Sequence, residues 1–322
     1  MSDVEPGVIV TLTANPSVDQ TVMLHNRLQR GAVQRISHTT SQAGGKGVNI
    51  SRAAVRAGVP TVAVLPAGAD DPFVLELTAA GIACRPSTPA GEVRTNLTIT
   101  EADGTTTKLN SPGAAMDAEH LEALSETVAL AGRDAAWVVL AGSLPPGAPP
   151  HFYADLAARL GRHARVAVDT SDLPLRVMCD RLAVSAPDVM KPNAEELVSV
   201  FGGDAERIED DPAAAASLAA ELVDRGVGAV LATLGGNGAV LVDRSGAWHA
   251  SPPPTEVLST VGAGDSSLFG YILGDLRGLP GPERLALAVA YGSAAASLPG
   301  TGIPAAGDVD PAGVRVDELV VR

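Results

Sequence analysis

The segment of this sequence best suited to chemistry is a glycine-rich run that ends in an acidic residue. Residues 259–267 read Ser-Thr-Val-Gly-Ala-Gly-Asp-Ser-Ser, and apolar residues with helical spacing follow them. Gly262, Ala263 and Gly264 let a ligand approach the backbone at the start of a helix, where free N–H groups bind phosphate. A carboxylate would repel phosphate there, so we interpret Asp265 as a general base toward an attacking hydroxyl, which predicts phosphoryl transfer. The alternative is a plain turn with Asp265 as the N-cap of the helix.

A second glycine-rich turn offers a cation. Residues 43–49 read Ala-Gly-Gly-Lys-Gly-Val-Asn. Gly45, Lys46 and Asn49, at the start of a helix, would suit a polar, anionic small molecule. The spacing is not that of a Walker A loop. A glycine-rich turn with an exposed lysine explains the same pattern.

Asn193 and Glu196 follow another predicted strand, three residues apart and just after Lys191. Both would occupy neighbouring positions in the first turn of a helix, where they could order waters around Mg²⁺. A capping box explains the same spacing, and both interpretations can hold together.

Two more strand exits carry candidate binding residues. Asp19 ends the segment Asn-Pro-Ser-Val-Asp after the first strand, where open α/β sheets bind ligands, and it could accept hydrogen bonds from sugar hydroxyls. A structural Asx-turn is the alternative. Thr233, Gly235 and Gly238 belong to a glycine loop against which a flat adenine ring could lie, with a hairpin turn as the alternative.

Composition narrows the class of protein. The chain has 322 residues, a hydrophobic fraction of 46%, an aromatic fraction of 3% and a formal net charge of −14. This length allows one large α/β domain with a core of Ala, Val and Leu. The negative charge argues against nucleic acid and anionic lipid as partners, so local cations must hold any phosphorylated ligand. The lysines of the chain are Lys46, Lys108 and Lys191, and two of them belong to the motifs above.

Several other kinds of site lack support. Cys84 and Cys179 are far apart with no ligand spacing around them, which supports neither a zinc site nor a disulfide framework. The histidines are scattered and no nucleophile elbow accompanies them, and Ser267 stands where a dinucleotide fingerprint needs glycine. The acidic residues 1–7 do not resemble a signal peptide, and no apolar run reaches about 18 residues, so we expect a cytoplasmic protein.

Alternating strand and helix patterns predict an α/β fold with a mostly parallel sheet. Strands are predicted at residues 8–14, 61–65, 137–141, 166–169, 189–191, 229–233 and 239–242. Helices are predicted at residues 48–57, 72–80, 117–131, 150–162, 194–201, 212–225, 265–276 and 282–297. Thr-rich segments predict a small second sheet, at residues 21–24, 34–40, 94–100 and 105–109.

In this order the motifs resemble the PfkB (ribokinase-like) carbohydrate kinases over nearly the whole chain. The matching segments are residues 15–19, 44–49, 94–96, 142–145, 191–196 and 261–265. The resemblance implies a three-layer α/β/α ribokinase-like fold in one kinase domain, residues 1–322, with a small β-sheet lid formed by insertions 19–41 and 93–110. The set is most similar to the branch acting on ketohexose phosphates: 1-phosphofructokinases, tagatose-6-phosphate kinases and minor 6-phosphofructokinases. Lys46 in the glycine motif resembles 1-phosphofructokinases and tagatose-6-phosphate kinases, because minor 6-phosphofructokinases tend to have glycine there. The whole sequence most resembles bacterial 1-phosphofructokinases.

The resemblance implies ATP- and Mg²⁺-dependent phosphorylation of fructose 1-phosphate to fructose 1,6-bisphosphate. Tagatose 6-phosphate and fructose 6-phosphate are the alternative acceptors, and a catalytically silent sugar-phosphate or nucleotide sensor is the alternative from another class. The lid would close over the sugar and build a homodimer. Members of the family can also bind a monovalent cation such as K⁺, here near Ser259, Val261 and Gly300.

The resemblance also implies a role for each site residue. Asp265 would be the base, and Gly262, Ala263, Gly264 and Asp265 would supply the anion hole. Asp19, Gly45 and Asn49 would hold sugar hydroxyls, and Lys46, Arg94 and Ser143 the substrate phosphate. The nucleotide side would comprise Lys191, Asn193, Glu196, Thr233, Gly235, Gly238 and Thr260, with Asn193 and Glu196 serving Mg²⁺ through water. Ala32, Gln34 and Glu195 depart from residues common at these positions in relatives.

Overall fold

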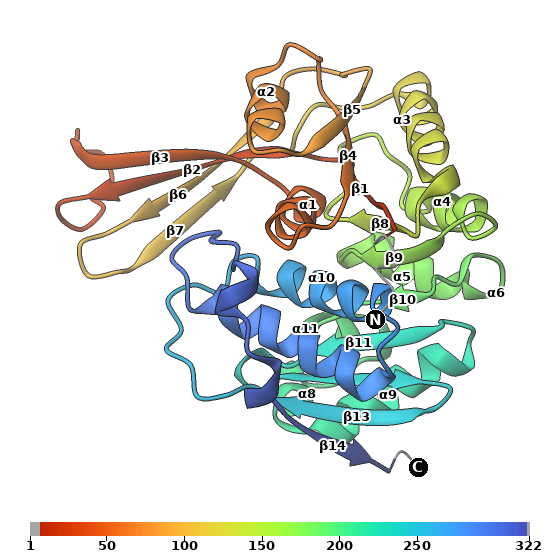
Figure 1. Ribbon diagram of the computed structural model, residues 1–322. Coiled ribbons are helices and arrows are strands. Elements are labelled where there is room, and N and C mark those ends of the chain that lie inside the picture. The colour runs from red at the N-terminus through yellow and green to blue at the C-terminus, as the bar shows by residue number, and fades with distance from the viewer. Residues whose placement is uncertain (1–6, 321–322) are drawn as a thin grey trace.

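A ten-stranded sheet forms the centre of the molecule (Figure 1). The computed structural model describes residues 7–320, so residues 1–6 of the acidic start lie outside the described part. In spatial order the strands are β14 (Arg315–Leu319), β13 (Gly246–Ser251), β12 (Ala239–Asp243), β11 (Ala229–Thr233), β10 (Val189–Met190), β9 (Arg165–Asp169), β8 (Trp137–Ala141), β1 (Ile9–Thr13), β4 (Thr61–Pro66) and β5 (Ala83–Ser87). From β11 to β5 neighbouring strands are parallel, which confirms the predicted sheet.

Helices cover both faces of this sheet, which is why its strands are continuous apolar runs. In β1, Ile9 packs toward one face and Val10 and Leu12 toward the other, and all three are fully buried. The Ile9 face carries α1 (Lys46–Arg56), α10 (Ala263–Leu276) and α11 (Gly281–Ala296). The opposite face carries α3 (Ala118–Ala131), α4 (Phe152–Leu160), α5 (Asp172–Asp180), α7 (Ala194–Phe201) and α9 (Pro212–Asp224). The three-layer arrangement is therefore confirmed.

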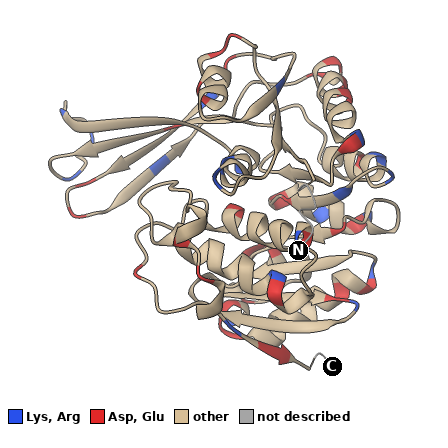
Figure 2. Ribbon diagram, viewed as in Figure 1, with Lys and Arg blue, Asp and Glu red and all other residues tan. Residues whose placement is uncertain are grey.

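Shorter helices complete the outer layers. They are α2 (Pro72–Ala79), which packs on β5, α6 (Leu182–Ser185), and α8 (Ala205–Asp210), which lies beside α7 and α9. Lys and Arg are dispersed over both halves of the ribbon in Figure 2. Within residues 7–320, none of the helices combines the length and apolar character needed to span a bilayer.

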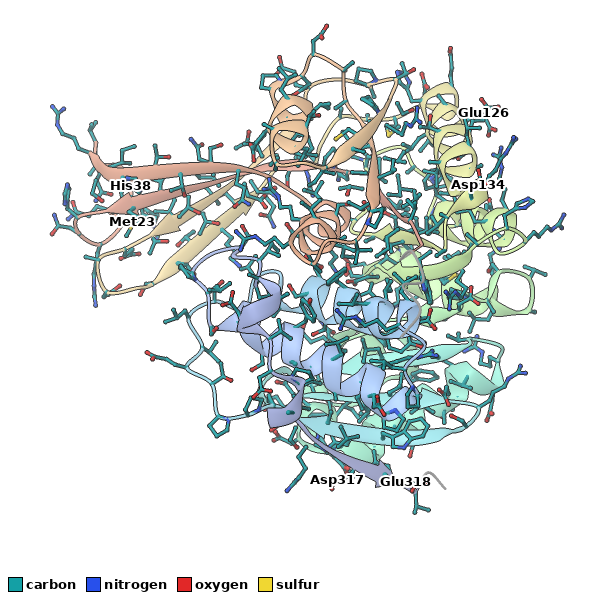
Figure 3. The ribbon with its side chains drawn as sticks, in the orientation of Figure 1. Met23, His38, Glu126, Asp134, Asp317 and Glu318 are labelled. Atoms are coloured by element: carbon teal, nitrogen blue, oxygen red, sulfur yellow. The ribbon has the colours of Figure 1, made fainter. Side chains whose placement is uncertain are left out.

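A second sheet of four strands stands off the central body at the left of Figure 1. Its order is β3 (Ile36–Gly44), β2 (Ser17–Leu24), β6 (Arg94–Thr100) and β7 (Thr106–Asn110). Met23 and His38 pair across β2 and β3, and Figure 3 shows both on this protruding sheet. The four predicted Thr-rich strands are thus confirmed, although β2 begins at Ser17 rather than Thr21 because the chain enters it directly from the Asn15-Pro16 turn.

The structure adds elements that the hydrophobic pattern did not predict. β5, β13 and β14 contain exposed or half-buried residues and lie at or near the sheet edges, so they lack the apolar runs of central strands. Helix α4 begins at Phe152 rather than at residue 150. Helix α10 begins at Ala263, with Gly262 as its N-cap, two residues before the predicted start.

The strand order indicates where in the sheet a ligand would bind. From β1 the chain continues outward to β4 and β5 on one side, whereas β8 pairs with β1 on the other side. The connections therefore diverge between β1 and β8, and open α/β sheets bind ligands at the carboxyl ends of strands at such a point.

Candidate active site

The carboxyl ends of the central strands open into a cavity of about 990 Å³. Every residue assigned to the site from the sequence lines it: Asp19, Gly45, Lys46, Asn49, Arg94, Ser143, Lys191, Asn193, Glu196, Thr233, Gly235, Gly238, Thr260, Gly262, Ala263, Gly264 and Asp265. The fold thus brings together motifs that are far apart in the sequence.

The start of α10 has the geometry predicted for an anion cradle. Gly262 has a φ of 80°, a left-handed conformation that favours glycine. The Ser266 N–H donates to the Gly262 carbonyl at 2.9 Å, while the N–H groups of Gly264 and Asp265 have no acceptor among residues 7–320. A Cβ on Gly264 would lie 3.2 Å from Lys191 Nζ, so glycine keeps the space beside this ammonium open.

Asp265 lies inside this first turn and is 6% exposed. It is the third residue of the helix and makes no cap, so its interpretation as an N-cap is wrong. Asn49 Nδ2 donates to Asp265 Oδ2 at 2.8 Å and fixes the carboxylate. Burial, reinforced by the charge of Asp169, raises the pKa of Asp265 to about 6, against the opposing effect of Lys46. A pKa near the working pH suits a general base.

Asp169, at the end of β9, is a site residue that the sequence analysis missed. Its side chain has no exposed surface; Lys46 Nζ donates to Oδ1 at 2.6 Å, and Lys191 Nζ lies 3.2 Å from Oδ2. Burial would raise the pKa of Asp169, but the two ammonium groups outweigh burial and hold it below its usual value. The available signal was position, because Asp169 closes an apolar strand at the ligand-binding edge.

Lys46 is therefore not a free surface lysine. Burial alone would lower its pKa, but the charges of Asp169, Asp265 and Glu196 raise the pKa above its usual value. Lys46 stays charged and its ammonium lies on the Asp169 side of the cavity.

The protruding sheet supplies the other end of the cavity. Asp19 Oδ1 accepts from Ser17 Oγ at 2.8 Å and from Asn96 Nδ2 at 3.1 Å, so it belongs to a strand network and not to an Asx-turn. Asn96, a second missed residue, pairs with Asp19 in register across β2 and β6. Arg94 reaches Ser143 Oγ at 3.4 Å and donates to the Ser111 carbonyl at 2.8 Å. This end of the cavity therefore combines one carboxylate, one guanidinium and several neutral polar groups.

The side of the cavity that the resemblance assigns to the nucleotide is built from strand exits. Asn193 and Glu196 form the predicted capping box: the Glu196 N–H donates to Asn193 Oδ1 at 2.8 Å, and the Asn193 N–H to Glu196 Oε2 at 2.9 Å. The residues from Thr233 to Gly238 join antiparallel strands β11 and β12, which confirms the hairpin alternative, and they also line the cavity. Burial raises the pKa of Glu196 above its usual value.

The oxygen donors here fit a hydrated divalent cation. Within residues 7–320, no group of three or more His, Cys, Asp or Glu side chains is arranged to hold a metal directly. The capping box uses Asn193 Oδ1 and Glu196 Oε2 but not Glu196 Oε1, and such a carboxylate oxygen suits Mg²⁺ with its retained hydration. Of the residues predicted near K⁺, Val261 lines the cavity, whereas Ser259 and Gly300 lie outside its lining.

Similarity to known proteins agrees with this geometry. Residues 12–306 match the description "pfkB family carbohydrate kinase". The chain is 37% identical over 286 residues to 1-phosphofructokinase of Xanthomonas campestris pv. campestris, covering 87% of this chain and 88% of the relative. It is 37% identical over 302 residues to 1-phosphofructokinase of Rhodobacter capsulatus, covering 92% of each.

A solved structure shows the same fold. Phosphofructokinase-2 of Escherichia coli, in complex with potassium, has a TM-score of 0.85 and 29% identity over 94% of this chain and 96% of that chain. The predicted resemblance is confirmed over most of the sequence. With its cavity at the switch point of the sheet and its ordered motifs, the chain belongs to the pfkB family of carbohydrate kinases.

Proposed function

We propose that this chain transfers the γ-phosphoryl group of ATP to fructose 1-phosphate and produces fructose 1,6-bisphosphate. One observation carries the proposal: Asp265, the anion cradle and Arg94 with Ser143 line one cavity. A hydroxyl beside the base can then face the nucleotide while the existing phosphate is held at the other end. Both relatives at 37% identity are named 1-phosphofructokinase.

In the proposed reaction Asp265 accepts the proton of the attacking hydroxyl. The freed oxygen forms a bond to the γ-phosphorus as the bond from that phosphorus to the departing ADP oxygen breaks. The N–H groups of Gly264 and Asp265 and the ammonium groups of Lys46 and Lys191 stabilise the negative charge on the transferred oxygens. Lys46, expected from the resemblance to hold the substrate phosphate, is assigned here to the reacting end because it pairs with Asp169. Asn49 keeps the Asp265 carboxylate aimed at the hydroxyl.

Asn193 and Glu196 would hold Mg²⁺ through water on the nucleotide side, and Mg²⁺, when bound, neutralises phosphate charge. Thr233, Gly235 and Gly238 would lie against the adenine ring of the nucleotide, with Thr260 nearby. K⁺ at the loop around Val261 is part of the proposal, supported by the potassium complex of the Escherichia coli relative. A cytoplasmic location also belongs to the proposal, since the phosphorylated substrates are charged and do not cross bilayers unaided.

We propose that the protruding sheet acts as a lid and a dimer interface. Strand alternation gives it a polar face with Asp19 and Asn96 toward the cavity, and an opposite face with Val22, Leu97 and Leu109. Leu109 is 54% exposed. Burying such a face against a second copy would account for its apolar character, and light scattering of the purified protein tests it by giving the mass of one chain or two.

The function is tested by ATP turnover with fructose 1-phosphate, fructose 6-phosphate, tagatose 6-phosphate and free fructose. We expect the highest kcat/KM with fructose 1-phosphate and at least a tenfold lower value with free fructose. A higher value with either 6-phosphate would reassign the substrate within the family. Ligand-induced stabilisation without turnover would instead identify a sensor, and equal values for free and phosphorylated fructose would refute the phosphate-binding role of Arg94.

A further inference from the structure

Asp169 lies among the groups of the proposed reaction, but none of the tasks described for them uses it. Its carboxylate is fully buried between two ammonium groups, and they hold its pKa below the usual value, so it remains ionised at neutral pH. A permanent anion beside a phosphate site opposes phosphate binding. Its presence there is explained if it serves the cations around it.

Three separate elements meet at this carboxylate. Lys46 starts α1, Lys191 follows β10, and Asp169 ends β9. A lysine side chain is long and flexible, so its ammonium has no fixed position unless a partner holds it. Here each carboxylate oxygen faces a different ammonium, at 2.6 Å for Lys46 and 3.2 Å for Lys191.

The place where these ammonium groups are held is the reacting end of the cavity. Lys191 Nζ lies against the open side of Gly264 in the anion cradle. Lys46 is close enough to Asp265 for the charges of the two groups to influence each other's pKa. Both cations therefore stand beside the first turn of α10, where phosphoryl oxygens would gather.

We propose that Asp169 is a positioning residue for phosphoryl transfer: its two carboxylate oxygens hold the ammonium groups of Lys46 and Lys191 beside the anion cradle of α10. The proposal rests on the kinase function above and extends it by one residue. Asp169 touches neither substrate in this role and acts through the two lysines.

The same carboxylate affects Asp265. The groups that influence Asp265 are Asp169, Lys46, Lys191 and the Asn49 amide, and of these Asp169 raises its pKa while the other three lower it. Replacing Asp169 by Asn removes the only one of these charges that opposes ionisation. The pKa of Asp265 should then fall, and the acidic limb of the pH profile should move to lower pH.

The test compares Asp169→Asn with Asp188→Asn. Asp188 Oδ2 accepts from the Val166 N–H at 2.7 Å at the other end of β9, so it controls for loss of a carboxylate bonded to this strand. We expect Asp169→Asn to lower kcat by up to about 100-fold, the effect of a misplaced reacting group, and to shift the acidic limb downward. Asp188→Asn should change neither. An unshifted limb with a kcat within twofold of the control would overturn the proposal.

A substrate-free measurement separates this inference from the proposed function. Carboxyl NMR titration of the protein alone should show a lower pKa for Asp265 in Asp169→Asn, whichever sugar the enzyme uses; an unchanged pKa counts against the proposal. If Asp169→Asn does not fold, Lys46→Met is compared with the double variant Lys46→Met, Asp169→Asn, because the double variant removes a cation together with its anion. Asp169→Asn should then lower kcat by less than about tenfold relative to Lys46→Met alone, since one of its two cations is already gone, whereas a further loss of about 100-fold would contradict the positioning role.

Discussion

Two buried aspartates, each held by two cations, lie at opposite ends of β9 and α10. Asp169 meets Lys46 and Lys191 at the carboxyl end of β9, beside the start of α10. Asp275, near the end of α10, meets Arg165 at the start of β9, Arg284 Nη1 at 2.9 Å and Trp137 Nε1 at 2.9 Å. The same charge pattern therefore occurs once at the cavity and once away from it.

The two clusters differ in how completely the carboxylate is satisfied. Asp275 has three donors, and the Arg165 guanidinium lies 4.8 Å from the centre of the Trp137 ring, so this cluster is closed in the sense that its carboxylate is fully satisfied. Asp169 Oδ2 has an ion-pair contact without hydrogen-bond geometry, and both of its lysines line the cavity. A cluster with a fully satisfied carboxylate joins elements of the fold. A cluster whose cations line the cavity can instead bind an incoming anion.

The largest expected effect at the cavity end is the loss of the base. Asp265→Asn keeps the side-chain shape but cannot accept the proton, so kcat should fall by about 100- to 10,000-fold. Steady-state kinetics at saturating ATP and sugar measure it. Full activity in this variant would remove Asp265 from the chemistry.

Loss of the phosphate contact should be next in size. Arg94→Ala removes a charged donor, which should raise KM for the phosphosugar by about 10- to 100-fold, given 1.5–3 kcal/mol for a charged hydrogen bond. Arg27→Ala in the loop between β2 and β3 is the control, since Arg27 is 84% exposed and pairs with Asp103 away from the cavity. Equal KM values in the two variants would contradict the assignment of Arg94.

The pH dependence sharpens the comparison further. Because the pKa of Asp265 is about 6, the ionised base is lost below that pH. We expect kcat/KM to fall by about tenfold per pH unit on the acidic side. The profile of the wild-type enzyme, with stability checked at each pH, measures this limb, and a limb near pH 4 would show that the carboxyl is not desolvated.

The smallest expected effect is on stability. The folded state raises the pKa of Asp265 from 3.8 to about 6, so it binds the extra proton, and the free energy of unfolding falls as pH rises through this window. Asp265→Asn removes this cost, up to roughly 3 kcal/mol at pH 7, and should raise Tm by about 4 °C. The gain should disappear below about pH 4, and thermal melts of both proteins across pH test it.

The sequence was sufficient where neighbouring residues alone determine the structure. Gly262 and Asp265 predicted the proposed anion cradle and base at the start of a helix, and apolar runs such as residues 137–141 predicted strands of a sheet covered on both faces. Asp169 and Asn96 depend on partners from other strands and helices, so spacing in the sequence did not reveal them. Strand β14 at the sheet edge and its neighbour β13 were missed because half-exposed strands lack a continuous apolar run.

The central claim is that the cluster at the cavity serves the reaction while the cluster at Asp275 serves the fold. The most direct test measures kcat per folded enzyme for Asp169→Asn and Asp275→Asn under identical conditions. We expect at least a tenfold loss for Asp169→Asn and a value within twofold of wild type for Asp275→Asn, whose effect should appear as a lower Tm. Equal losses of kcat in the two variants would contradict the account.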